Sequence, residues 1–285
     1  MALLLAGLAA VAYGTGDLVG GLSIRRSGRE GAALSTAVVA TVVGCLVCSI
    51  LLVVLPPEQV TSSDVGWSAL AGLAMAATRP LLYLGMSRGP IAVFAPGYSL
   101  TAIAVPALAG PLIGQRLSGW ELLGVLLAIP AVLLLCGEGR LPRVAEVVRS
   151  AVLGQAVVVG FCIGLSGIFF SRVDVAAGIM PAFVTLLVGS LILPVYAVLA
   201  PGPRAPYRSV LRLGSLVGVT SAVAFALGTT AFQRGSAAVV TAMICMAPAV
   251  SILLAWRLLG ERVARLQVLG GAFGLGVLIL FALGA

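Results

Sequence analysis

The sequence predicts an all-α membrane protein with ten transmembrane helices, arranged as two inverted five-helix repeats. Three observations predict this fold class: the composition, ten apolar runs, and an internal repeat. Of the 285 residues 61% are hydrophobic and 9% are charged, whereas a soluble domain normally carries about 25% charged residues. Much of any folded surface faces its solvent. We therefore expect that solvent to be lipid.

Apolar runs of about 20 residues are long enough to cross a bilayer. The chain contains ten of them, separated by short connectors rich in proline, glycine or arginine. They cover roughly 2–22, 32–55, 66–87, 90–113, 119–137, 151–171, 178–200, 211–233, 236–258 and 265–284. No basic segment precedes the first run, and its arginines follow it, which indicates a first membrane helix rather than a signal peptide.

The two halves of the chain repeat each other. Ser87–Val93 corresponds to Gln233–Val239 with an offset of 146 residues, and the same offset relates Gly114–Arg116 to Gly260–Arg262. Each half holds five spans, so the second half is expected to be inverted relative to the first. Secondary transporters often use this design, with the substrate bound between the repeats near the bilayer midplane. The expected units are a first repeat over 1–137, a connecting loop over 138–150 and a second repeat over 151–285.

These residues resemble the drug/metabolite transporter superfamily, specifically its ten-helix EamA-type members. The second copy carries the pattern in Gln233-Arg234-Gly235, Ala247-Pro248, Gly260-Glu261-Arg262 and Gly270-Gly271. The first copy departs from it by placing Gln115 where Glu is usual, and the opening Tyr13–Gly21 is similar to the first helix of bacterial members. The resemblance implies transport of a small metabolite or drug, more commonly by export, and it does not specify the substrate.

Two ionisable residues, Asp17 and Arg79, lie well inside apolar runs. A charge at the bilayer centre costs at least about 2.5–3.5 kcal/mol, so it is usually paired or faces a cavity. We expect the two side chains to lie at similar depths and to pair. The pair is either a structural ion pair or part of the substrate cavity. In the second case Asp17 would bind a substrate amine or a coupling proton, and Arg79 would bind a carboxylate or phosphate.

Helical spacing identifies further candidate contacts on the faces of the same and neighbouring helices. A mostly apolar pocket with a few polar groups would suit an amphipathic organic ligand. The candidates are Tyr13, Met75, Tyr83, Tyr98, Thr101, Met243 and Met246. In the repeated turns, Arg116, Glu261 and Arg262 are candidate gating residues.

The composition also excludes several classes of function. The chain has no His, which removes His-based triads, His proton relays and most zinc hydrolase sites. No P-loop is present, so we expect secondary transport coupled to protons or to solute exchange, with no metal and no cofactor. The arginines form no arm or patch that would bind nucleic acid. An enzyme is disfavoured, and a flippase for lipid or lipid-linked substrates is the alternative with the same fold.

The arginines predict the orientation. Thirteen lie in connectors that follow odd-numbered spans and three in connectors that follow even-numbered spans. The positive-inside rule then places both termini outside the cytoplasm, with the protein in the cell membrane. The glycine-rich last span fits close packing either within one chain or in a homodimer, so monomer and homodimer both remain open.

Overall fold

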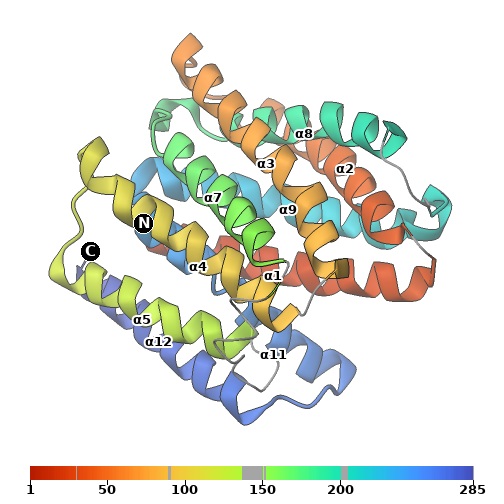
Figure 1. The fold of residues 1–285 in the computed structure, drawn as a ribbon. Coiled ribbons are helices and arrows are strands. Elements are labelled where there is room, and N and C mark those ends of the chain that lie inside the picture. The colour runs from red at the N-terminus through yellow and green to blue at the C-terminus, as the bar shows by residue number, and fades with distance from the viewer. Residues whose placement is uncertain (30, 89–90, 137–149, 151, 200–204, 285) are drawn as a thin grey trace.

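A computed structural model describes the chain except residues 30, 89–90, 137–149, 151, 200–204 and 285, and it describes only the backbone of residues 79–80, 82–88 and 91–92. The described residues form helices joined by turns (Figure 1). The helices are α1 (Ala2–Ser27), α2 (Ala32–Val54), α3 (Ser62–Arg88), α4 (Ile91–Ala109), the 3-10 turn η1 (Gly110–Ile113), α5 (Gly119–Cys136), α7 (Leu153–Phe170), the 3-10 turn η2 (Val175–Ala177), α8 (Met180–Leu199), α9 (Tyr207–Arg234), α10 (Ala237–Ile244), α11 (Ala247–Leu259) and α12 (Arg265–Gly284).

The predicted membrane architecture is confirmed. Within the described residues, nine helical segments are long and apolar enough to cross a membrane, with α10 and α11 counted as one. Helix α3 has 27 residues, a length that would also cross a bilayer. Large apolar side chains such as Leu4 (63% exposed), Val53 (82%) and Ile279 (61%) point outward, as expected where the solvent is lipid.

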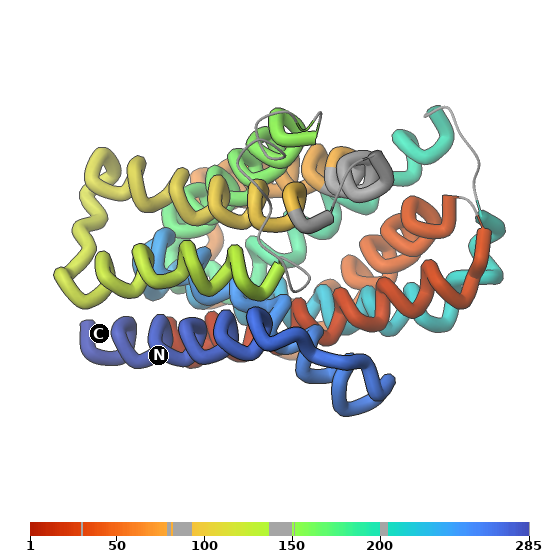
Figure 2. Tube along the Cα trace, turned by 60° about the horizontal axis from the view of Figure 1, so that its bottom comes forward, coloured from red at the N-terminus to blue at the C-terminus, as the bar shows by residue number. Residues whose placement is uncertain are grey.

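Successive membrane spans run in opposite directions, so the connections between them lie alternately at two ends of the molecule. We call one the termini end, because the N- and C-termini lie close together there (Figure 2). It also holds the α2–α3, η1–α5, α7–α8 and α9–α10 connections. The opposite end, with the α1–α2, α8–α9 and α11–α12 connections, is the arginine-rich end.

Glycines let the helices pack closely inside the chain. A Cβ on Gly14 of α1 would lie 2.5 Å from the Ala247 carbonyl oxygen of α11, and Gly160 of α7 is equally tight against the Tyr98 carbonyl of α4. On α12, a Cβ on Gly270 would lie 2.9 Å from Leu134 of α5. Close approach of backbones is a main source of stability between lipid-solvated helices. These small-residue faces are therefore used for packing within one chain.

One capping contact recurs in both halves. The backbone N–H of Ser118 donates to Glu121 Oε2 at 2.7 Å where α5 begins, and the N–H of Ala264 donates to Gln267 Oε1 at 3.0 Å where α12 begins. The two pairs are 146 residues apart, the offset found in the sequence. Corresponding residues of the two halves therefore cap the first turns of corresponding helices, α5 and α12.

The crossing of α2 and α8 repeats in the same manner. A Cβ on Gly44 would lie 3.5 Å from Leu186, and a Cβ on Gly189 would lie 3.0 Å from Thr41. Gly44 and Gly189 are 145 residues apart, and so are Thr41 and Leu186. The two contacts therefore join corresponding positions of α2 and α8. The local packing of the two halves is thus alike.

The expected span 236–258 is confirmed as a candidate membrane span over Ala237–Leu259, but it is not one continuous helix. Helix α10 ends at Ile244 and α11 begins at Ala247, with Cys245 and Met246 in a turn between them. Pro248 lies in the first turn of α11, a position where the missing N–H of proline costs no helical hydrogen bond.

Candidate functional site

Asp17 lies on the interior side of α1. Leu8, which is 47% exposed, lies roughly 180° around the helix from Asp17, because nine residues separate them. The sides of α1 between Leu8 and Asp17 contact other helices, because Gly16 packs against Thr220 of α9 and Gly14 packs against α11. The Asp17 side chain is exposed, on the side of α1 opposite the outward-pointing Leu8. The carboxylate therefore points away from the lipid-facing side of α1.

Polar and sulfur-containing groups from three other segments lie around Asp17. Tyr98 of α4 and Cys136 at the end of α5 lie near Asp17, and Cys245 in the α10–α11 turn lies near Tyr98 and Cys136. The structure therefore brings the predicted residues Asp17 and Tyr98 together beside the helix break.

The break also brings equivalent positions of the two halves into contact. Cys245 Sγ lies 3.8 Å from the Ser99 carbonyl oxygen, and these positions differ by the repeat offset of 146. Residues at equivalent positions can meet only where the two halves adjoin. The Ser99–Cys245 contact therefore marks the junction between the halves, close to Asp17.

An aromatic and sulfur-rich layer lies next to this site. The ring of Tyr13 packs edge-on against Phe225 of α9, with centroids 5.8 Å apart. Met75 Sδ accepts a hydrogen bond of 3.3 Å from Ser166 Oγ of α7. Met75 and Phe225 line a small void together with Thr185, whose buried Oγ1 has no partner among the described residues.

The other predicted residues have different surroundings. The Thr101 hydroxyl donates to the Gly97 carbonyl of its own helix at 2.9 Å. Met243 and Met246 are almost fully buried in the main core, Met243 in the last turn of α10 and Met246 in the break itself. Arg79 and Tyr83 belong to α3, but their side chains lie outside the described residues. The predicted Asp17–Arg79 pair therefore stays a prediction.

Hydrogen bonds join segments from both halves at the termini end. The N–H of Ala237, at the start of α10, donates to Gln115 Oε1 at 3.0 Å. Gln233 Nε2, at the end of α9, donates to the carbonyls of Asp174 and Gly178 in the α7–α8 connection, both at 3.1 Å. These bonds hold the turns of this end together.

A second link at the termini end involves Asp64, in the first turn of α3. Its Oδ2 accepts from Thr61 N (2.9 Å) and Thr61 Oγ1 (2.6 Å), and its Oδ1 accepts from Asp174 N at 3.0 Å. Burial raises the pKa of Asp64, but these hydrogen bonds outweigh it and hold the pKa below its ordinary value. The carboxylate thus ties the start of α3 to the α7–α8 connection.

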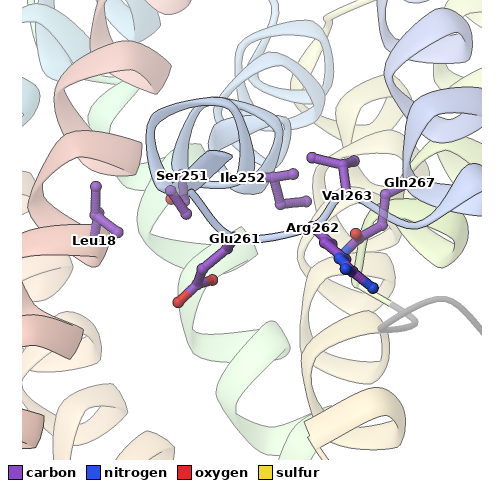
Figure 3. Close-up of a pocket in the computed structure, with 8 residues that line it drawn as sticks. Leu18, Ser251, Ile252, Glu261, Arg262, Val263 and Gln267 are labelled. Carbon is purple, nitrogen blue, oxygen red and sulfur yellow. The ribbon is translucent and has the colours of Figure 1, made fainter. Parts of the chain in front are cut away.

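A cavity of about 250 Å³ lies at the arginine-rich end, between α1, α11, the α11–α12 turn and α12. Glu261 lies on the α1 side of this cavity and Arg262 on the α12 side (Figure 3). Glu261 Oε1 also forms an ion pair of 3.0 Å with Arg25 Nη1. Of the three predicted gating residues, Glu261 and Arg262 therefore line a cavity, whereas exposed Arg116 lies at the termini end.

Sequence reasoning missed the roles of Gln233, Asp64 and Asp174. The Thr61–Asp64 spacing is a capping-box signal that could have been read from the sequence. Gln115 was noted only as a departure from the repeated pattern. Its contact with the start of α10 joins residues 122 positions apart, and no local pattern reports such a contact.

These features define a multi-pass helical membrane protein with an acidic group on the interior side of α1. Residues 151–283 match the model of the EamA-like transporter family. The second half of the chain is thus similar to this family, which confirms the resemblance found in the sequence and indicates a transporter of the drug/metabolite type.

The fold extends over both halves. One solved crystal structure of a protein has a TM-score of 0.76 to this chain, covers 99% of it and is itself covered to 96%. Its sequence is 18% identical, so the likeness shows the fold alone. No curated protein matches the sequence significantly.

Proposed function

We propose that this protein is a secondary active transporter that exports a small organic metabolite or drug by alternating access between two inverted five-helix halves. The observation that carries the proposal is the position of Asp17, on the interior side of α1 and beside the α10–α11 break. Interrupted helices line the substrate sites of many secondary transporters, and an intramembrane acid marks a functional site by default. Asp17 is the proposed site for a substrate amine or a coupling proton.

The matching contacts of the two halves support an inverted repeat. They comprise the capping pairs of α5 and α12, the mutual α2–α8 contacts and the Ser99–Cys245 junction. Two alike halves that meet at one junction can exchange conformations, and this exchange would open the site first to one end and then to the other.

The difference between the two ends of the structure supports assigning this conformer to one state of the transport cycle. A hydrogen bond between the halves joins the termini end through Gln115, whereas the 250 Å³ cavity lies at the arginine-rich end. If the arginine-rich end faces the cytoplasm, as the charge distribution favours, this conformer is open inward. An exporter would load its substrate in that state.

The first test is the thermal stability of the purified protein in the presence of amines, amino acids, sugars, phosphates and nucleosides. A ligand that binds only the folded state raises its apparent stability. We expect an amine or amino acid to raise the unfolding temperature of the wild type. In Asp17→Asn its affinity should fall roughly tenfold or more, because a hydrogen bond to a charged group contributes about 1.5–3 kcal/mol.

The matched control is Glu58→Gln, which neutralises an exposed carboxylate at the termini end and should leave the ligand's effect unchanged. A ligand whose effect survives Asp17→Asn would make Asp17 structural and would end the site assignment, while the resemblance to the family would stand.

A further inference from the structure

One outer face of α9 combines arginines at its end with an apolar stripe. Arg208, Arg212, Leu216, Val219 and Val223 follow one another at intervals of three or four residues and therefore share a side of the helix. All five are exposed, with Leu216 at 52%, Val219 at 42% and Val223 at 40%. The face is basic at the arginine-rich end and apolar from there inward.

Helix packing shows that this face points toward the bilayer. Gly218 packs against Ala40 and Val43 of α2, and Thr220 lies against Gly16 of α1. Val219 lies between these two residues in the sequence. Its side chain therefore points out of the gap between α1 and α2, away from both helices. The stripe therefore contacts lipid chains.

The end of α1 adds a further arginine to this surface. Ser27 Oγ and Ser209 Oγ are hydrogen-bonded at 3.1 Å, and this bond fixes the last turn of α1 against the first turn of α9. Arg26 precedes Ser27 and Arg208 precedes Ser209, and both side chains are exposed. Arginines from two helices therefore gather at the same place.

The charge of this surface is not compensated within the described part of the chain. The ion pair found there joins Arg25 to Glu261, and no described acidic side chain lies within ion-pair distance of Arg26, Arg208 or Arg212. The first turn of α9 also holds no acidic residue. Because the N-terminal end of a helix carries a partial positive charge, a cation there is unfavourable and an anion is favourable.

We propose that this surface, made of Arg26, Arg208, Arg212, Leu216, Val219 and Val223, binds an anionic phospholipid of the surrounding bilayer. The guanidinium groups would hold the phosphate, since their planar donors match phosphate oxygens in a bidentate manner. One acyl chain would lie along the stripe, which extends about 16 Å from Arg212 to Val223 at 1.5 Å per residue. The apolar stripe favours a lipid over a soluble phosphate.

The test is a titration of the purified full-length protein, in zwitterionic detergent, with phosphatidylglycerol and with phosphatidylcholine of the same acyl chains. Lipid adducts are counted by native mass spectrometry. We expect phosphatidylglycerol to bind at least tenfold more tightly than phosphatidylcholine. In the triple variant Arg26→Gln, Arg208→Gln, Arg212→Gln that affinity should fall on the order of a hundredfold, since each arginine near an anionic headgroup contributes roughly fivefold.

The matched control removes the same number of exposed arginines from the termini end, in Arg116→Gln, Arg172→Gln, Arg234→Gln, and should keep wild-type binding. The single variant Arg212→Gln, with an expected loss of about fivefold, serves if the triple variant fails to fold. Equal loss in the control, wild-type binding in the Arg26, Arg208 and Arg212 variants, or equal binding of phosphatidylcholine would overturn the proposal. Competition by soluble glycerol phosphate at the same concentration would instead assign the site to a free anion and would overturn the lipid proposal as well.

Discussion

Asp64 is a sheltered carboxylate whose charge is retained by hydrogen bonds. It is 4% exposed, and it accepts from Thr61 and from the backbone of Asp174. A buried charge is tolerated when its lone pairs are satisfied. Here the same bonds also join two connections that are far apart in the sequence, so a local cap acts as a tertiary link.

The depressed pKa of Asp64 predicts how stability depends on pH. Because the folded-state pKa lies below the unfolded value of about 3.9, the ionised group stabilises the fold above that value, and this contribution is lost as the pH falls through the folded pKa. We expect the unfolding temperature to fall below about pH 4 in the wild type and to fall less in Asp64→Asn. At pH 7 the variant should be less stable by about 1–3 kcal/mol.

Thermal unfolding followed between pH 3 and pH 7 measures this difference. Glu58→Gln, an exposed carboxylate close by in the sequence, should follow the wild-type profile. Identical acid profiles for the wild type and Asp64→Asn would show that the Asp174 link does not contribute to stability.

Residue-level prediction from sequence works best where a residue type is unusual for its surroundings. Asp17 stands out because a carboxylate inside an apolar run is costly; the structure places it on the side of α1 opposite Leu8, and its role stays a prediction. Asp174 could not be found in this way. It lies in a connector, where acids are ordinary, and its N–H meets Asp64 only because the two connections fold onto each other.

At the scale of elements, α4 and the α10–α11 segment occupy equivalent places but differ in continuity. Helix α4 stays continuous although Pro96 and Pro106 lie inside it, whereas the equivalent segment breaks before Pro248. All three prolines look alike in the sequence. Whether a proline interrupts a membrane helix depends on neighbouring groups that satisfy the freed carbonyls, and those neighbours come from tertiary structure.

Gln115 is expected to control the stability of the closed termini end. Gln115→Ala removes the acceptor of the Ala237 N–H. The loss of about 1 kcal/mol should raise the population of conformers open at this end roughly fivefold. A variant that keeps Cys245, at the helix break, as its single cysteine would report this change as faster labelling by a membrane-impermeant maleimide applied from the termini side.

The control for this experiment is Ser236→Ala. Ser236 precedes α10 but makes no side-chain cap to it, so its removal should leave the labelling rate unchanged. If Gln115→Ala labels no faster than the control, the hydrogen bond does not hold the end closed.

At the scale of the whole molecule, the sequence predicted the positions of nine of its ten spans, which are candidate membrane helices among the described residues. Each span is an apolar run of nearly sufficient length by itself, and the lipid environment imposes this local requirement independently of partners. The contacts between spans were not predictable to the same degree. Glycine spacing indicated close packing, but only the structure shows that Gly270 meets α5 within the same chain.

The charge asymmetry of the molecule leads to a final prediction on its orientation. The connectors that follow odd-numbered spans carry 13 Arg and four acidic residues, whereas those that follow even-numbered spans carry three Arg and four acidic residues. Because basic connectors remain in the cytoplasm, both termini should lie outside it. A fluorescent reporter that matures only in the cytoplasm should be dark when fused after Ala285, and a phosphatase that requires export should be active there. A bright fluorescent fusion would reverse the orientation, and the conformer described above would then be open outward, the state in which an exporter releases its substrate.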